Sequence, residues 1–217
     1  MGYDSTRDFQ PLILFGSSPQ ILAVTPSLPI RSVKELIEQA RAKPGALSFG
    51  SSGVGSGQHL AMELLKIMTD TNMVHVSYKG IQQAITDVIG GQIHIVCDNI
   101  SSMLPHVRSG RVRALAVATL KRAPLVPELP TIDEAGIAGY ELTTWAGYAL
   151  PARAPRDLVV RLNAEINKAL SSPSVSKAMA DRGAIPIGGT PAQFAEHLRR
   201  ETVKLAGVIK AAGIKPQ

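Results

Sequence analysis

Short β-branched runs alternate with amphipathic helical stretches between residues 21 and 115, and this alternation constrains the fold more than any other feature. Helices are expected to begin after the capping box of Ser32 and Glu35, near Gly57, and at about residues 81 and 101. Strands are expected at about 21–25, 47–50, 74–78, 93–97 and 113–119. This spacing predicts right-handed βαβ crossovers, a mostly parallel sheet and an α/β fold for this repeating part.

The rest of the chain does not continue this alternation of strands and helices. Proline residues punctuate a loop over 124–130, and Thr131 with Glu134 is expected to cap a small helix ending at Gly136. A strand is expected at 144–150, and long helices at about 155–170 and 190–212. These are too few strands to complete a second sheet, so this part is interpreted as an incomplete domain.

Composition excludes several classes of protein. Hydrophobic residues make up 45% of the chain and charged residues 18%, which indicates a globular protein with an aliphatic core. The net charge is +6, but the basic residues are scattered and aromatics make up only 4%, so nucleic-acid binding is not expected. No apolar run approaches the roughly 20 residues of a membrane span. Cys97 is the only cysteine, so an internal disulfide is excluded.

The most informative segment runs from Phe49 to His59 and contains Ser51, Ser52, Gly53, Val54, Gly55, Ser56 and Gly57. Its alternating glycines let the backbone turn sharply, and the following helix directs its positive end into the same space. Such a loop suits a carboxylate or phosphate, although a plain turn between strand and helix has the same composition. The glycine spacing matches neither G-x-G-x-x-G nor a P-loop.

Polar residues also follow two other expected strands. Lys79 and Gly80 come after one strand and Asp98 after another, so in a parallel sheet they share an edge with the serine-glycine loop. Asp98 could accept a hydrogen bond from a ligand or cap the next helix. Lys79 could clamp an anion or remain solvated.

Catalytic groups are not evident. The histidines form no H-x-x-x-H pattern, there is one thiol, and no G-x-S-x-G elbow is present. We therefore expect no catalytic residues, no metal and no cofactor. His75 and His94 lie inside expected strands, which favours structural roles. The alternative is an enzyme that acts on an anionic metabolite with Asp98 or His59 as acid or base.

A succession of short motifs resembles the receptors of tripartite tricarboxylate transporters, also called Bordetella uptake gene (Bug) proteins. The motifs occur in order over essentially the whole chain from Tyr3, and together they are highly specific. They are Tyr3–Phe9, Pro26–Pro29, Gly50–Gly53, Val74–Gly80, Gly90–Gln92, Leu115–Val117, Leu129–Thr131, Glu134–Gly136, Gly139–Glu141 and Ala211–Ile214.

The resemblance implies a periplasmic-binding-protein-like (type II) Venus flytrap, which closes two α/β domains on a small carboxylate and passes it to a membrane permease without catalysis. Residues 21–115 are expected to form the complete second ligand-clamp domain, and residues 1–20 with 116–217 the remaining part of the first. The loop Ser51–His59 matches the family's carboxylate-binding loop, and Asp98 matches its strand-end aspartate. Ser77 stands where the family usually has proline.

The chain departs from the family pattern at its front. Family members are periplasmic and carry a signal peptide and a leading glycine-rich segment, whereas Met1-Gly2 is followed by polar residues without a secretion signal. We therefore expect one complete domain and one incomplete domain. A further expectation is that exposed apolar surface leads to homo-oligomers, or that the fragment does not bind a ligand alone.

Overall fold

The computed structural model describes residues 3–215, so Met1-Gly2 and the last two residues of the expected first domain lie outside the described part. Its larger sheet has five strands in the order β4-β3-β5-β2-β6. Their bounds are β2 (Gln20–Val24), β3 (Ser48–Ser51), β4 (Val74–Ser77), β5 (Ile95–Asn99) and β6 (Arg113–Val117). All five strands occur close to their expected places.

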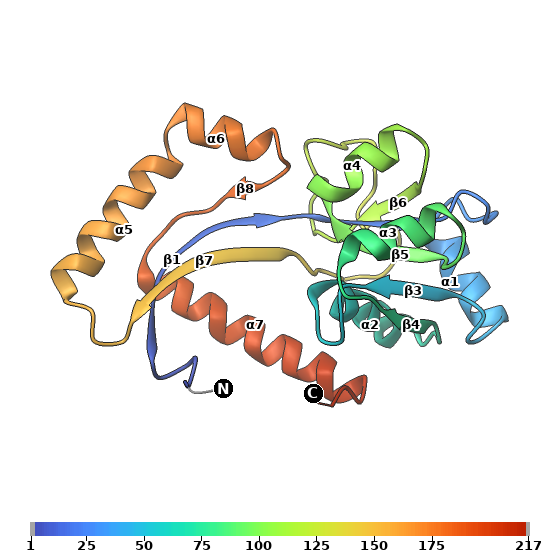
Figure 1. Ribbon diagram of the computed structural model, residues 1–217, viewed down its shortest axis with the longest axis horizontal. Helices are drawn as coiled ribbons and strands as arrows, with labels where there is room; N and C mark the ends of the chain where they lie inside the picture. The colour runs from blue at the N-terminus through green and yellow to red at the C-terminus, as the bar shows by residue number, and fades with distance from the viewer. Residues whose placement is uncertain (1–2, 216–217) are drawn as a thin grey trace. The chain divides into compact units, whose positions relative to one another are not determined.

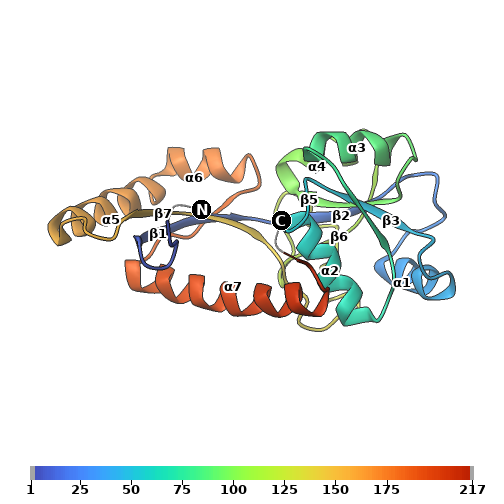
Figure 2. The ribbon, with the colours of Figure 1, turned by 60° about the horizontal axis from the view of Figure 1, so that its bottom comes forward.

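Helices cover both faces of this sheet because successive strand residues bury opposite faces. Leu22 and Val24 pack with α1 (Val33–Ala42) and α2 (Gly57–Thr69), whereas Ile21 and Ala23 pack with α3 (Ile81–Ile89) and α4 (Ile100–Arg108). Figure 2 shows the two helical layers on either side of the strands. The structure is therefore mixed α/β, as expected from the alternation.

The expected direction of one strand is wrong. β3 pairs in parallel with β4 and β5, but β2 pairs antiparallel with both β5 and β6. The segment from β2 to β3 is thus not a parallel βαβ unit. The period of apolar residues identifies a strand but carries no information on its direction, which depends on the partners beside it.

Two compact units divide the chain at different residues from those expected. The five-stranded unit comprises Pro19–Thr144 and Leu205–Gln217, and the three-stranded unit comprises Met1–Ser18 and Trp145–Lys204. Residues 118–144 belong to the five-stranded unit because they continue its sheet and core. The N–H of Ile132 donates to Val117 O, that of Leu142 donates to Ala118 O, and the hydroxyl of buried Tyr140 donates to Ala61 O.

The smaller sheet has three strands in the order β7-β1-β8 and was not expected from the sequence (Figure 1). Its strands are β1 (Phe9–Ser18), β7 (Thr144–Pro151) and β8 (Ile185–Pro186). The helices are α5 (Arg156–Leu170), α6 (Pro173–Ala180), which was also missed, and α7 (Pro191–Ala211), whose last residues belong to the five-stranded unit. Asn163 joins α5 to β1 by donating to Leu12 O at 2.9 Å.

The small helix expected at 131–136 is a turn. Thr131 and Glu134 do form the predicted reciprocal capping contacts, with each backbone N–H donating to the other's side chain at 3.0 and 2.9 Å. Gly136 has a φ of +105°, which ends the turn before a helix can propagate. Local capping residues therefore identified the position of the turn but not that the helix fails to form.

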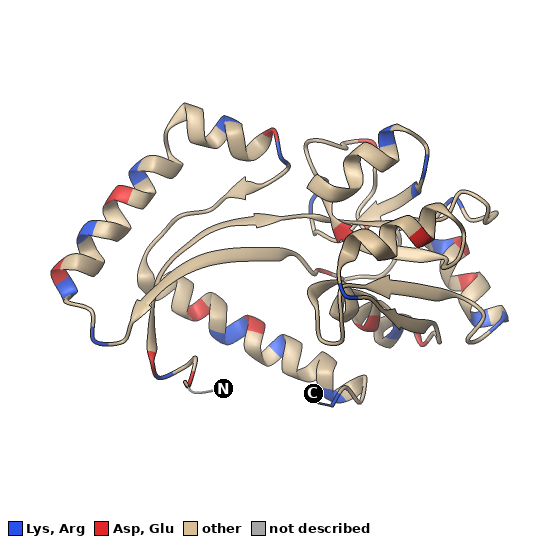
Figure 3. Cartoon of the chain, in the orientation of Figure 1, with Lys and Arg blue, Asp and Glu red and all other residues tan. Residues whose placement is uncertain are grey.

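Charge is distributed rather than gathered on one element. Lys and Arg alternate with Asp and Glu along α5 and α7 (Figure 3). On α7, Arg199 pairs with Glu196 and Lys204 with Glu201. Among the helices of residues 3–215, none has the length and apolar content needed to span a bilayer.

Candidate functional site

The expected site residues follow three neighbouring parallel strands. β3, β4 and β5 lead into α2, α3 and α4 respectively, so their carboxyl ends and the three helix N-termini share one edge of the sheet. The pairing of Ser51 with Ser77 places the serine-glycine loop beside the segment that contains Lys79 and Gly80. Helix N-termini carry partial positive charge, so this edge favours an anion.

The loop between β3 and α2 needs glycine at two positions. Gly53 has a φ of +139° and Gly55 a φ of +77°, which are conformations that residues with a Cβ rarely adopt. Apart from the adjoining residues of the chain, no atom of the described residues lies within 4 Å of a Cβ built at either glycine, so the backbone conformation and not crowding requires glycine there.

Several backbone amides of the loop donate hydrogen bonds to acceptors in the loop or in the first turn of α2. The N–H of Gly53 donates to Ser51 Oγ at 3.1 Å, and that of Gly55 donates to His59 Nδ1 at 3.0 Å. Ser56 is the N-cap of α2 and accepts from the N–H of His59. Within the described residues, the amides of Gly57 and Gln58 in the first turn have no acceptor. The amides of Gly53, Gly55 and His59 are thus engaged in hydrogen bonds within the loop.

A hydrogen-bonded chain joins the loop to the end of β5. Ser52 Oγ donates to Gln58 Oε1 at 3.0 Å, and Gln58 Nε2 donates to Asp98 Oδ1 at 2.8 Å. The second carboxylate oxygen of Asp98 accepts from the hydroxyl of Ser102 on α4. Asp98 is 2% exposed and does not cap α4, whose N-cap is Asn99.

Gln58 was not among the expected site residues. Its place in the first turn after a glycine-rich loop was the available signal, but its partner Asp98 is 40 residues away in sequence. A pattern of residues close together in sequence does not indicate a hydrogen bond between residues this far apart.

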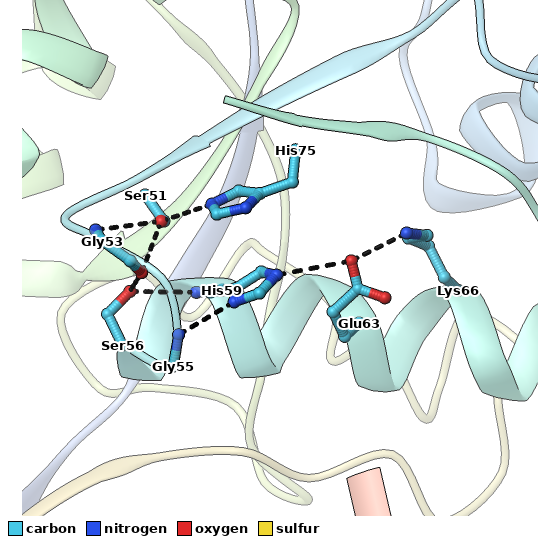
Figure 4. Close-up of polar contacts among 8 residues, drawn as sticks. All are labelled: Ser51, Gly53, Gly55, Ser56, His59, Glu63, Lys66 and His75. Carbon is cyan, nitrogen blue, oxygen red and sulfur yellow. Dashed lines mark hydrogen bonds and ion pairs between the residues drawn. The ribbon is translucent and has the colours of Figure 1, made fainter. Parts of the chain in front are cut away.

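His59 lies behind the loop, among polar groups that hold it in shape (Figure 4). The ring is 5% exposed and stacks on His75 with ring centroids 3.8 Å apart. His75 Nε2 lies 2.6 Å from Ser51 Oγ, which is buried and donates to Gly53 O. Through these contacts both histidines support the conformation of the loop.

The remaining expected residues differ in their surroundings. Lys79 and Val54 are exposed, and Gly80 is the N-cap of α3 without a side-chain hydrogen bond. His94 Nδ1 accepts from the backbone N–H of Ser48 at 3.0 Å. The structure brings the loop, Gly80 and Asp98 to one sheet edge. Whether they bind a ligand stays a prediction.

Acid–base groups near the loop are engaged in internal contacts. Burial lowers the pKa of His75 to about 4, with a further contribution from the charge of His59. Burial also raises the pKa of the Cys97 thiol, whose Sγ is 3.4 Å from Gln20 Oε1. No cluster of three or more potential metal ligands was found among residues 3–215.

Known proteins resemble the chain along its full length. Residues 1–214 match the family model described as tripartite tricarboxylate transporter family receptor. The UPF0065 protein in the tcbD-tcbE intergenic region of Pseudomonas sp. strain P51 is 40% identical over 92% of this chain and 60% of its own length. The chain thus spans about three fifths of that curated relative.

Solved structures support the same relationship. Rpa4515 of R. palustris, solved with adipate, is 40% identical and superposes with a TM-score of 0.90 over 100% of this chain and 73% of its own. The periplasmic binding protein BugD is 29% identical with a TM-score of 0.85, again over 100% of this chain and 73% of its own. The shared fold is that of periplasmic binding proteins.

The matching family is one of transporter receptors and not of enzymes, and BugD is a periplasmic binding protein. The match extends over both units of the structure, including the serine-glycine loop and Asp98. The chain therefore belongs to the family of tripartite tricarboxylate transporter receptors.

Proposed function

We propose that this chain binds a small organic carboxylate at the carboxyl edge of β4, β3 and β5 and does no chemistry on it. The observation that carries the proposal is the pair of amides at the start of α2, those of Gly57 and Gln58, for which residues 3–215 provide no acceptor. Two adjacent N–H groups at a helix N-terminus match the two oxygens of a carboxylate and supply favourable charge. The adipate in Rpa4515 is a ligand of this class.

The other site residues have supporting roles in this proposal. Gly53 and Gly55 shape the loop, Ser56 caps α2, and Ser51 and His59 hold the loop from behind. Ser52 and Asp98 are bridged by Gln58. Val54, Lys79 and Gly80 lie at the same edge and would contact the part of the ligand beyond its first carboxylate.

In its biological setting the protein would be a periplasmic receptor that delivers its ligand to a membrane permease of the tripartite tricarboxylate type. The family relationship and the periplasmic neighbour BugD support this placement.

A second proposal concerns self-association. The three-stranded unit exposes large apolar side chains, including Tyr148 at 54%, Val160 at 61% and Val203 at 75%. Light scattering coupled to size-exclusion chromatography distinguishes a monomer from an assembly.

The binding proposal is tested by removing one amide while leaving the helix intact. Gly57 occupies the first helical position, where proline is well tolerated, and Ser56 has the extended conformation that proline requires before it. Gly57→Pro deletes one N–H, and Gly57→Ala is the matched control that keeps it. The nearest atom to an added Cβ is Gln20 Nε2 at 3.6 Å, an ordinary contact.

Calorimetry with mono- and dicarboxylates, adipate included, should give binding to the parent chain and to Gly57→Ala. Gly57→Pro should lose about 1.5–3 kcal/mol of binding free energy, since a hydrogen bond to a charged group is removed. Equal affinities of the two variants for a carboxylate would place the ligand elsewhere. Absence of binding by the parent chain to every carboxylate would contradict the proposed function.

A further inference from the structure

The reversed direction of β2 brings its first residue, Gln20, to the sheet edge that carries the proposed site. β3, β4 and β5 end at this edge, and Gln20 pairs with Asn99, the last residue of β5. The side chain of Gln20 is fully buried. Its Nε2 lies 3.6 Å from a Cβ built on Gly57 and is the one described atom within 4 Å, apart from neighbouring residues and the α2 backbone. Gln20 therefore lies beside the first residue of α2.

Two contacts determine which way the Gln20 carboxamide faces. Burial raises the pKa of the Cys97 thiol, so the thiol keeps its proton and donates to Gln20 Oε1, with Sγ at 3.4 Å. The nitrogen end of the carboxamide then faces Thr144, and Nε2 donates to Thr144 Oγ1 at 3.2 Å. A carboxamide nitrogen donates and does not accept, so Thr144 Oγ1 is the acceptor in this contact.

The hydroxyl hydrogen of Thr144 is consequently available for another contact. A hydroxyl carries one hydrogen, and this one cannot be donated to Gln20 Nε2. Residues 3–215 provide no other hydrogen-bond partner for Thr144 Oγ1. Thr144 is exposed and is the last residue of the segment Pro19–Thr144, which also contains α2. Its hydroxyl hydrogen is therefore open to a bound molecule.

The distances place this hydroxyl near the start of α2. Gln20 Nε2 is the common neighbour of Thr144 Oγ1, at 3.2 Å, and of the Cβ position of Gly57, at 3.6 Å. The amides of Gly57 and Gln58, for which the described residues provide no acceptor, are therefore within the length of a small ligand from Thr144. An ionised carboxylate accepts about four hydrogen bonds through its two oxygens, so the two amides leave room for a third donor.

We propose that Thr144 is a ligand-binding residue whose hydroxyl donates to the carboxylate held by the amides of Gly57 and Gln58. Gln20 is the positioning residue that directs this hydroxyl, because its Nε2 occupies the acceptor side of Thr144 Oγ1. This role of Thr144 rests on the proposed function, and it adds a side-chain donor to a site otherwise formed by backbone amides.

The role of Thr144 is tested by removing its hydroxyl while keeping the branched shape of the side chain. Thr144→Val does so, and Thr144→Ser keeps the hydroxyl. Thr143→Val is the matched control, because Thr143 is the neighbouring threonine and its side chain makes no hydrogen bond within residues 3–215. Adipate, and the other carboxylates that bind the parent chain, are the probes, measured by calorimetry.

Thr144→Val should lower the affinity for the carboxylate about ten- to a hundredfold, since a hydrogen bond to a charged group is removed. Thr143→Val should bind as the parent chain does, and Thr144→Ser should recover most of the affinity. Because Thr144 is exposed, its variants should keep the fold of the parent chain. Equal affinities of Thr144→Val and Thr143→Val would overturn the proposal.

A double-mutant cycle tests whether Gln20 acts through Thr144. Gln20→Met removes the donor to Thr144 Oγ1 and keeps a buried side chain of similar size. It should weaken carboxylate binding by the parent chain about three- to tenfold, but have little further effect in Thr144→Val. A loss by the same factor in both backgrounds would mean that Gln20 supports the fold of the site and does not direct the Thr144 hydroxyl.

The proposed function and the role of Thr144 fail in different ways. Absence of binding by the parent chain to every carboxylate contradicts both. Weaker binding by Gly57→Pro, together with unchanged binding by Thr144→Val, supports the proposed function and refutes the role of Thr144.

Discussion

At the scale of single residues, Gln58 is the side chain that ties the loop to the sheet. Its amide accepts from Ser52 and donates to Asp98, so it uses both ends of the carboxamide in one chain of hydrogen bonds. Asp98 is buried, and a buried carboxylate that loses a donor bears the cost of its own desolvation. The contact therefore matters for stability as well as for the shape of the site.

We expect Gln58→Ala to lower the free energy of unfolding by about 1–3 kcal/mol, because Asp98 keeps Ser102 but loses its other donor. Gln83→Ala, an exposed glutamine on α3, should change it by less than about 0.5 kcal/mol. Urea denaturation of both variants measures the difference. A Gln58→Ala variant as stable as Gln83→Ala would show that water replaces the lost donor.

At the scale of elements, β3 approaches α3 so closely that one position on it has no room for a side chain. A Cβ at Gly50 would lie 2.7 Å from Ala84 Cβ on α3 and 2.6 Å from Ile93 Cδ1. Gly50 is therefore needed for packing, whereas Gly53 and Gly55, a few residues later, are needed for their backbone conformation. The two requirements together bring the loop to its place at the sheet edge.

Gly50→Ala should destabilise the five-stranded unit by about 1–3 kcal/mol through overpacking. Gly207→Ala on α7 is a suitable control, since an added Cβ there meets no atom within 4 Å. That change should stabilise the helix by about 0.5–1 kcal/mol. Thermal unfolding of the two variants should give shifts of opposite sign, and a shift of the same sign would contradict the packing argument.

At the scale of the whole molecule, the two units have cores of different size. The five-stranded unit holds two extensive clusters of buried apolar side chains, one on each face of its sheet. The cluster of the three-stranded unit has Leu12, Ile13 and Val159 as its buried members. Since buried apolar area is the main source of stability, the smaller unit should open more readily.

Hydrogen exchange measured by mass spectrometry tests this expectation. Peptides from β1 and α5 should exchange faster than those from β3, β5 and α2 under native conditions. Slower exchange in β1 than in β5 would mean that the amount of buried apolar surface does not predict which unit opens more readily.

The sequence by itself determined the strands β2 to β6, the helices α1 to α4 and the family of the chain. α3 begins at Ile81 and ends at Ile89 as its periodicity predicted, and Ser32 caps α1 by accepting from Glu35 N–H. These features depend on residues a few positions apart, so a local pattern specifies them. The α/β class and the receptor family followed from the alternation and from motifs that occur in order.

Tertiary structure alone decided how distant segments meet. It reversed β2, added residues 116–144 to the five-stranded unit, and made β1 the centre of a sheet although its run from Pro11 to Phe15 shows no alternation. It also joined Gln58 to Asp98 and stacked His59 on His75. The physical reason is the same in each case: strand direction, domain membership and side-chain partners depend on contacts between residues far apart in the chain, which hydrophobic period and capping residues do not encode.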